Sequence, residues 1–341
     1  MARFLNPARL LAAGLVLLAA VAVLLAVLYV APSDKYIFLP DRARAVAPLV
    51  DVEGERPDRN GGGIYYVAVD VRKATVLEKL IPSLHEGATL VDVSEVRAPG
   101  EDEQQHRRAE LASMRRSQQY AAAVALRSLG YRIQIVPRGA LIETTVKGFP
   151  AAGKLRAKDL VIAVDGHEVR SPDEFRALIG RRRPGEIVRL RVKRRKRIRT
   201  VAIRTTRNPE RPDRPFIGVL IHEPGVKLPV PVRINTGDVG GPSAGLAFAL
   251  DVVQELGRDV DRGHKVAATG ELRLDGSVGA VGGIKQKTIG ARRAGADIFL
   301  VPEDNEREAR RHAGGLRVIA VNSFRQALRS LATLKSSPQK T

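Results

Sequence analysis

The chain contains no cysteine and no tryptophan, and aromatic residues make up only 4% of its 341 residues. The absence of cysteine excludes disulfide bonds and thiolate metal sites, and it is compatible with either side of a membrane. The sequence also lacks a Gly-x-x-x-x-Gly-Lys-Ser/Thr phosphate-binding loop, so an ATP-driven unfoldase is not encoded in it. We therefore expect neither a cofactor nor a metal site.

The chain is strongly basic, because its 57 lysines and arginines outnumber its 37 acidic residues and give a formal net charge of +20. The excess concentrates in one stretch, namely Arg181–Arg183, Arg189, Arg191 and Lys193–Arg197. Alternation within it predicts a strand with one solvated face. No aromatic residues interleave, so nucleic acid is not an expected partner. We favour a self-repelling sheet edge, with contact to anionic lipid or a cell-wall polymer as the alternative.

Near the N-terminus, Leu10–Ala31 forms 22 residues without a charge, long enough to cross a bilayer as a helix. A cleavable signal peptide would have a shorter apolar region, and Pro32 disfavours cleavage after Ala31. The segment therefore predicts an uncleaved single-pass membrane anchor. We expect a cytoplasmic N-terminus and an extracytoplasmic body.

The region that follows, residues 32–130, offers no recognisable chemistry. Its patterns predict strands at Ile64–Val71 and Ala88–Val96 and a long helix at Asp102–Leu129, which Gly130 ends. We interpret this region as a scaffold.

Residues 131–207 form a compact pattern of short strands around one capped helix that begins after Ser171. This pattern, above all the segment Leu155–Gly166, resembles a bacterial PDZ domain. The resemblance implies that an extended peptide adds to a sheet edge. The expected peptide-binding residues are Arg138, Gly139, Ala140 and Leu141. The alternative is a small β domain whose turns have no binding role.

The stretch Gly240–Lys287 carries the strongest chemical signal. A glycine-rich turn presents Ser243 just before an apolar helix, where backbone N–H groups and the helix dipole could stabilise an oxyanion. The alternative is that Ser243 only caps the helix. None of the six histidines stands in a recognisable triad setting, so the base must be sought elsewhere.

Two lysines follow Gly283, and a helical projection separates them. Lys287 falls on the apolar face, whereas Lys285 points to the other side; the apolar face comprises Ile284, Lys287, Thr288, Ala291 and Ala294. A lysine held against a core loses hydration, its pKa falls, and it can act as a base near neutral pH. The alternative is a lysine whose amine reaches past the apolar face to solvent.

Four ordered motifs within residues 216–335 resemble the proteolytic domain of Lon proteases: Pro242-Ser243-Ala244-Gly245, Ala268-Thr269-Gly270-Glu271, Gly282-Gly283-Ile284-Lys285-Gln286-Lys287 and Asp297–Pro302. The resemblance implies a catalytic Ser243–Lys287 dyad, with Thr269, Gly241 and Pro242 in support. Gly240 is a departure, because ATP-dependent Lon enzymes commonly carry an acidic residue there.

The predicted fold is an α+β multidomain chain with an N-terminal transmembrane helix, a β-rich PDZ-like domain and an α/β Lon-type proteolytic domain. Its expected parts are a cytoplasmic N-terminus (1–9), the anchor (10–31), an extracytoplasmic scaffold (32–130), the PDZ-like domain (131–207), the proteolytic domain (208–335) and a disordered tail (336–341). This order resembles the membrane-anchored PDZ–Lon peptidases of bacteria.

The predicted function is an ATP-independent, membrane-anchored serine endopeptidase. It would cleave unstructured or partly unfolded protein segments that the PDZ-like domain captures, and oligomers are compatible with the sequence. The alternative is a membrane-tethered PDZ binding or scaffold protein with a catalytically idle Lon-like domain.

Overall fold

The computed structural model describes residues 7–52, 61–97, 102–209, 211–222 and 224–336. The predicted tail lies outside the described residues except for its first position. The chain divides into two compact units, which we call unit 1 (Met1–Ala121 with Arg233–Thr341) and unit 2 (Ala122–Val232). Unit 2 is thus inserted into the sequence of unit 1. The predicted domain boundaries stay a prediction.

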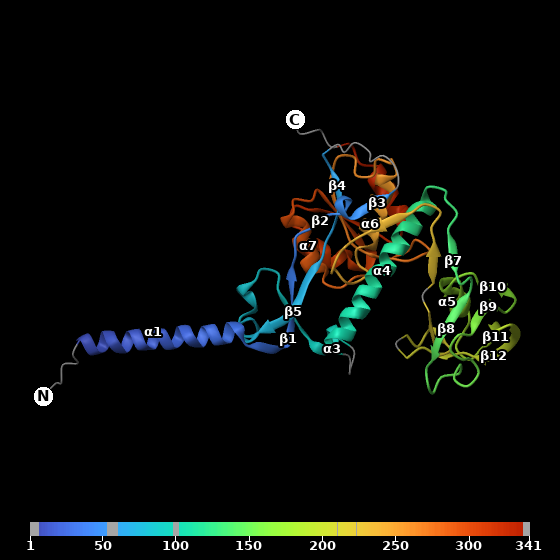
Figure 1. The fold of residues 1–341 in the computed structure, drawn as a ribbon, viewed down its shortest axis with the longest axis horizontal. Coiled ribbons are helices and arrows are strands. Elements are labelled where there is room, and N and C mark those ends of the chain that lie inside the picture. Colours follow the sequence, from blue (N-terminus) through green and yellow to red (C-terminus); the bar gives the residue numbers. More distant parts are fainter. Residues whose placement is uncertain (1–6, 53–60, 98–101, 210, 223, 337–341) are drawn as a thin grey trace. The chain divides into compact units, whose positions relative to one another are not determined.

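Unit 1 is built on a mostly parallel sheet of five strands (Figure 1). In spatial order these are β2 (Arg44–Ala45), β4 (Gly63–Tyr66), β18 (Lys265–Ala268), β21 (Ile298–Pro302) and β22 (Arg317–Val321). Only β2 runs antiparallel to its neighbour. The pairing of β4 with β18 joins two segments separated by about two hundred residues, so the early part of the chain completes the sheet of the late part.

Smaller groups of strands complete unit 1. A second, antiparallel sheet has the order β5-β1-β6, and two further pairs of strands are described. Their bounds are β1 (Pro32–Pro40), β5 (Val69–Thr75), β6 (Thr89–Asp92), the pair β3 (Val50–Val52) and β17 (Val232–Ile234), and the hairpin β19 (Glu271–Leu272) and β20 (Val278–Gly279). The single strand predicted at Ala88–Val96 is β6 followed by a helical turn, and the one predicted at Ile64–Val71 is split between β4 and β5.

Four helices pack around the central sheet: α6 (Gly245–Glu255), α7 (Ile284–Arg293), α8 (Glu306–His312) and α9 (Phe324–Ala332). Every residue of α6 is buried, as its apolar sequence predicts. Phe299 and Val301, alternate residues of β21, pack in one cluster with Ile284 and Ala291 of α7. This cluster fixes the rotation of α7 about its axis, and hence the direction of its lysines.

The remaining helices of unit 1 include a long one, α4 (Glu103–Ser128), close to the bounds predicted for it. It starts in unit 1 and ends in unit 2. The short helices are 3-10 turns at Ala47–Leu49, Pro82–Leu84 and Glu303–Asn305, and α2 (Val76–Leu80) and α3 (Val93–Val96).

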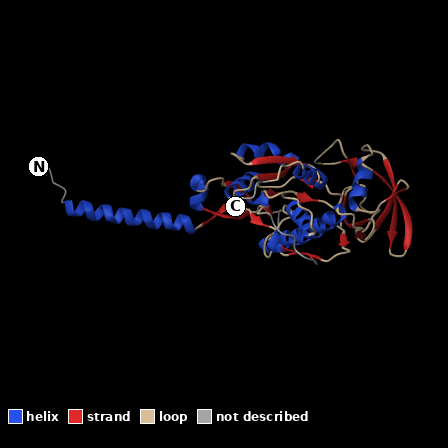
Figure 2. Ribbon diagram, turned by 90° about the horizontal axis from the view of Figure 1, so that it is seen from above, coloured by secondary structure: helices blue, strands red, loops and turns tan. Residues whose placement is uncertain are grey.

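The uncharged N-terminal segment forms one unbroken helix, α1 (Pro7–Val30), which Figure 2 shows at the N-terminal end. Among the residues that the structure describes, however, no helix has both the length and the apolar character needed to cross a membrane. The predicted transmembrane anchor at 10–31 is therefore wrong, and so is the single-pass membrane localisation with a cytoplasmic N-terminus and an extracytoplasmic body.

Besides the end of α4, unit 2 contains a sheet with the order β12-β11-β9-β8-β15 and the helix α5 (Pro172–Gly180). The strands are β8 (Ala140–Thr145), β9 (Leu160–Val164), β10 (His167–Glu168), β11 (Ile187–Arg194), β12 (Arg197–Arg204) and β15 (Val219–Ile221). Further short strands are β7 (Gln134–Val136), β13 (Thr206–Arg207), β14 (Pro215–Phe216) and β16 (Gly225–Lys227). Phe175 and Ile179 of α5 pack into a core with Val188, Leu190 and Val192, alternate residues of β11.

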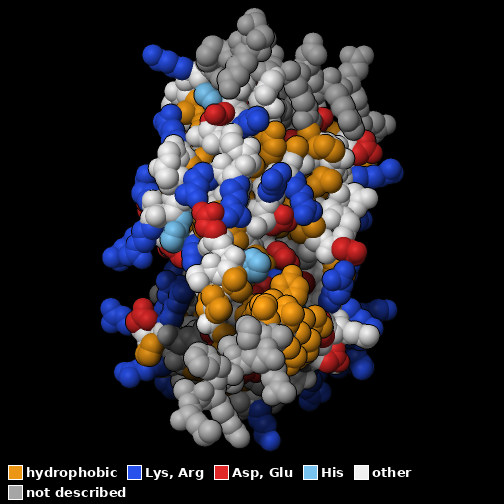
Figure 3. All heavy atoms as spheres, turned by 90° about the vertical axis from the view of Figure 1, so that its left-hand side faces the viewer, with side chains coloured by type: hydrophobic (Ala, Val, Ile, Leu, Met, Phe, Trp, Pro, Cys, Tyr) orange, Lys and Arg blue, Asp and Glu red, His pale blue; other side chains and the backbone are white. Residues whose placement is uncertain are grey.

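The other face of β11 is solvated. Arg189, Arg191 and Lys193 are exposed, while the residues between them are buried, which confirms the predicted alternation. Lysine and arginine side chains are also spread across the face of the molecule in Figure 3, in keeping with the net charge of +20.

Candidate active site

Ser243 lies in the turn that leads into α6. Gly241 has a φ of +86°, a left-handed conformation that glycine adopts without strain. The N-cap of α6 is Ala244, and no side chain caps this helix end. In the described part of the chain the Ser243 hydroxyl has no hydrogen-bond partner. The structure therefore differs from the alternative in which Ser243 only caps the helix.

The backbone carbonyl of Ser243 is held from two sides. It accepts a hydrogen bond of 2.8 Å from the amide of Gly270 and one of 3.1 Å from the Thr269 hydroxyl. A Cβ at Gly270 would lie 2.5 Å from a methyl group of Val278, so this close approach requires glycine. The segment after β18 thus fixes the position of the serine turn.

Lys287 is buried in α7, with only 3% of its surface exposed. This helix starts after Gly283, which has a left-handed φ of +65°. The Lys287 amine donates a hydrogen bond of 3.3 Å to the hydroxyl of Thr269. Burial strips the amine of water and lowers the pKa of Lys287 from 10.5 to about 7. The lysine therefore exists in substantial part as a neutral base at neutral pH.

The neighbouring lysine has a different setting. Lys285 is half-buried, and its amine donates a hydrogen bond of 3.1 Å to the carbonyl of Ala88. Next to it, the Gln286 amide donates one of 2.8 Å to the carbonyl of Gly87. This side of α7 is attached to the loop before β6. The predicted separation of the two lysines by the helical projection is confirmed.

Helix α4 holds the other side of the serine turn. The Ser117 hydroxyl donates a hydrogen bond of 2.9 Å to the carbonyl of Pro242, and the amide of Gly241 donates one of 3.1 Å to the carbonyl of Glu110. A Cβ at Gly240 would lie 2.8 Å from the Cβ of Glu110. The lack of a side chain at Gly240 therefore permits the close approach of α4.

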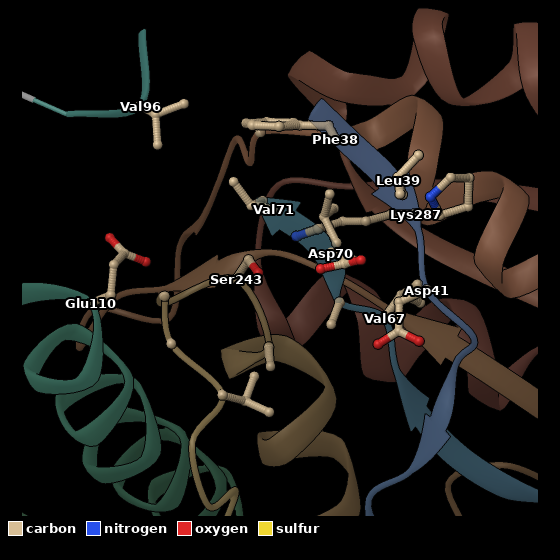
Figure 4. A pocket seen from close by; sticks show the side chains of 18 of the residues that line it. Phe38, Leu39, Asp41, Val67, Asp70, Val71, Val96, Glu110, Ser243 and Lys287 are labelled. Carbon is tan, nitrogen blue, oxygen red and sulfur yellow. The ribbon is translucent and has the colours of Figure 1, made fainter. Parts of the chain in front are cut away.

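Ser243 and Lys287 line one pocket of about 1110 Å³ within unit 1. In Figure 4 the Lys287 side chain extends into this pocket in the direction of Ser243. Strands β1 and β5 contribute Phe38 and Asp70 to its walls, and α4 contributes Glu110. Among the described residues, no group of three or more candidate ligand side chains is arranged to hold a metal ion.

Sequence reasoning missed the residues that the early part of the chain contributes. Asp70 and Glu110 belong to the region interpreted as a scaffold, and the sequence surrounding them carries no motif. The alternating side chains of residues 64–71 predicted a strand. The position of that strand at the pocket, however, depends on pairings between distant segments.

The predicted peptide-binding residues lie where β8 begins in unit 2. Ala140 and Leu141 pair with β9 on one side, and on the other side the carbonyl of Leu141 accepts a hydrogen bond of 2.8 Å from the amide of His222. Gly139 donates its amide to the carbonyl of Arg170, and Arg138 lies 3.3 Å from Glu168. Strand β8 is thus an interior strand of its sheet. Peptide binding at these residues stays a prediction.

Comparison with known proteins agrees with both units. Residues 226–331 match the Lon protease (S16) C-terminal proteolytic domain, and residues 127–205 match the PDZ domain. The Lon protease of Clostridium acetobutylicum is 46% identical over 68 residues, which cover 20% of this chain and 9% of that protein. Lon protease 1 of Sorangium cellulosum is 40% identical over 114 residues, which cover 31% of this chain and 14% of that protein.

Part of the chain is also similar to solved structures of PDZ domains. The PDZ domain of an SdrC-like protein from Listeria innocua is 29% identical and covers 25% of this chain and 94% of its own, with a TM-score of 0.24. The aligned segments span 9% and 14% of the two Lon proteases named above, so the chain corresponds to a small part of each. The chain therefore carries a Lon-type proteolytic domain and a PDZ domain, at residues 226–331 and 127–205 respectively.

Proposed function

We propose that the chain is an ATP-independent serine endopeptidase in which Ser243 is the nucleophile and Lys287 the general base. One observation carries the proposal: a buried lysine with a pKa of about 7 lines the same pocket as a serine whose hydroxyl has no partner among the described residues. A serine beside a desolvated lysine is a variant of the serine protease triad. The Lon-type domain match supports the same reading.

In the proposed reaction, neutral Lys287 takes the proton of the Ser243 hydroxyl as its oxygen attacks the scissile carbonyl. The protonated lysine then gives that proton to the leaving amine, and the C–N bond breaks to leave an acyl group on Ser243. Water, activated by the same lysine, releases the acyl group and restores the serine. A pKa near 7 suits both steps, since the lysine must accept a proton and then lose it.

The oxyanion would be stabilised by backbone N–H groups of the turn that carries Ser243, because the amides of Gly245 and Leu246 at the start of α6 already donate to the carbonyls of Pro242 and Gly270. One such donor contributes about 2.7–4 kcal/mol in comparable sites. Thr269 would orient the base, because its hydroxyl accepts from the Lys287 amine while donating to the Ser243 carbonyl. Gly241 and Pro242 would shape the turn.

The substrates in this proposal are unstructured or partly unfolded protein segments. The sequence contains no phosphate-binding loop for an unfolding motor, so a folded substrate would have no source of unfolding work within this chain. The PDZ domain would supply substrate capture through an extended peptide segment.

The decisive experiment treats the purified protein with a fluorophosphonate or peptide-boronate probe. We expect labelling that Ser243→Ala abolishes and that Ser330→Ala, at a half-buried serine of α9, retains. Labelling of the Ser243→Ala protein to the same extent would exclude Ser243 as the nucleophile. Absence of both labelling and peptide cleavage in the unaltered protein would instead favour a binding protein with an idle proteolytic domain.

Capture by the PDZ domain is tested by removing unit 2 and joining its flanking ends with a flexible linker. We expect cleavage of a long unfolded protein to fall more than cleavage of a short reporter peptide. Continued probe labelling of Ser243 is the control for a folded site. Equal losses on both substrates would mean that unit 2 has no part in capture.

A further inference from the structure

Acidic side chains outnumber basic ones in the lining of the pocket. It is lined by seven carboxylates, Asp41, Asp70, Glu86, Glu95, Glu103, Glu110 and Asp238, and by four basic side chains, Arg44, Arg107, Lys287 and Arg293. This excess of acidic groups is opposite in sign to the chain, whose formal net charge is +20.

Each of the three arginines forms an ion pair with a carboxylate. Arg44 lies 2.8 Å from Asp41, Arg107 lies 3.4 Å from Asp238, and Arg293 lies 2.7 Å from Glu86. The fourth basic group, Lys287, is buried beneath the pocket surface and accounts for little positive charge there.

Four carboxylates remain, which we call the acidic wall: Asp70, Glu95, Glu103 and Glu110. Within the described ranges of the chain, none of them forms an ion pair. Asp70, Glu95 and Glu103 are exposed and Glu110 is half-buried, so a ligand can reach all four. Of these carboxylates, only that of Glu95 has a hydrogen-bond partner among the described residues, the amide of Asp92 at 3.4 Å.

Two members of the acidic wall flank the serine. Figure 4 shows the carboxylates of Glu110 and Asp70 on opposite sides of Ser243. Glu110 is fixed there by its backbone bond to Gly241, and its carboxylate would lie 3.1 Å from a Cβ on that residue. A substrate segment bound at Ser243 would therefore lie in a pocket that carries carboxylates on two of its walls, from α4 and from β5.

We infer that the pocket selects cationic peptide segments, in which lysine or arginine side chains flank the bond that is cut, and that Glu110 and Asp70 are the specificity-determining residues. The inference rests on the proposed function for its catalytic part, whereas the binding preference stands on the charge of the pocket alone. A neutral segment would leave these carboxylates unpaired, and an acidic one would be repelled by them.

The test uses three quenched fluorescent peptides of identical length and unstructured sequence, which carry lysine, glutamine or glutamate at the same positions. We expect kcat/KM to fall in that order. Glu110→Gln and Asp70→Asn should each reduce the ratio of the lysine to the glutamine peptide by roughly three- to fivefold, the upper range for an exposed ion pair. Glu308→Gln, at an exposed carboxylate of α8 outside the pocket, is the matched control and should preserve the ratio.

A binding measurement separates this inference from the proposed function. Fluorescence anisotropy with the Ser243→Ala protein reports the affinity for the same peptides without cleavage, and added salt should weaken the preference for lysine. Failure of every peptide to be cleaved would count against the proposed function, while the anisotropy would still decide the charge preference. Equal affinity for the lysine and glutamate peptides, or a ratio that neither pocket variant changes, would overturn the inference.

Discussion

The amine of Lys287 and the hydroxyl oxygen of Thr269 lie 3.3 Å apart, and both residues are buried. The same hydroxyl lies 3.1 Å from the carbonyl oxygen of Ser243. One side chain therefore positions both the proposed base and the turn that carries the proposed nucleophile.

Thr269→Val should reduce kcat by on the order of 10- to 100-fold, because a misplaced base loses its alignment with the serine. The methyl group keeps the shape of the site but makes neither hydrogen bond. Thr269→Ser keeps the hydroxyl and should restore most of the activity. The measurement is kcat on a peptide substrate for the three proteins, and a serine variant as slow as the valine variant would contradict the role of the hydroxyl.

The pKa of Lys287, lowered by burial to about 7, predicts the pH dependence of the reaction. Only the neutral amine can accept the serine proton, and its fraction falls as the pH drops below the pKa. We expect kcat/KM to decrease about tenfold per pH unit on the acid side of this pKa and to level off above it. A profile whose rise is centred near the ordinary lysine value of 10.5 would show that the base is not desolvated.

The two lysines of α7 should behave differently when replaced. Lys287→Ala removes the buried base and should abolish turnover while the fold persists. Lys285→Ala removes the bond to the carbonyl of Ala88 at the far side of the helix and should retain most of the activity. Circular dichroism checks the fold of each, and the reverse pattern of activities would show that the lysines have been assigned wrongly.

The same pKa shift predicts a change in stability with pH. Lys287 binds its proton more weakly in the folded state than in the unfolded one, where the value is near 10.5, so the free energy of unfolding should rise as the pH increases from about 7 towards that value. Lys287→Met removes the titrating amine and with it this pH dependence. The free energy of unfolding of the variant should exceed that of the unaltered protein most below pH 7. Above pH 7 this difference should shrink by about 1.4 kcal/mol per pH unit. Urea titrations at neutral and alkaline pH measure it, and a constant difference would contradict the shift.

Gly290→Ala should destabilise unit 1, although alanine normally favours a helix over glycine. A Cβ at this position would lie 2.0 Å from the backbone carbonyl oxygen of Asp41, which cannot move as a side chain would. We expect a loss of about 1–3 kcal/mol in the free energy of unfolding. Gly315→Ala, with open space around it, is the control for thermal denaturation. Similar melting temperatures for both would argue against the close packing of α7 on this backbone.

The sequence predicted those features of the pocket that depend on a pattern within a single element. The period of α7 placed Lys287 inward and Lys285 outward, and the apolar run after Ser243 indicated a buried helix, because in both cases the pattern repeats within a single element. The motifs around both residues also indicated the proteolytic domain that the family comparison identifies.

The pocket residues that the sequence did not predict reach the site through contacts between distant segments. Asp70 and Glu110 reach the pocket only because β4 pairs with β18 and α4 contacts Gly241, and no local pattern encodes either pairing. The membrane anchor was predicted from the absence of charge over Leu10–Ala31, and the described helix does not bear it out.

The insertion of unit 2 into unit 1 has a consequence for dissecting the chain. A fragment that begins after the PDZ domain would keep Ser243 and Lys287 but would lose β4, and with it the parallel neighbour of β18. The newly bare edge would present unpaired amides and carbonyls to any other chain, a template for aggregation. The motifs that carry the proposed catalytic residues therefore lie close together in sequence, whereas the sheet beneath them draws strands from both sides of the inserted unit.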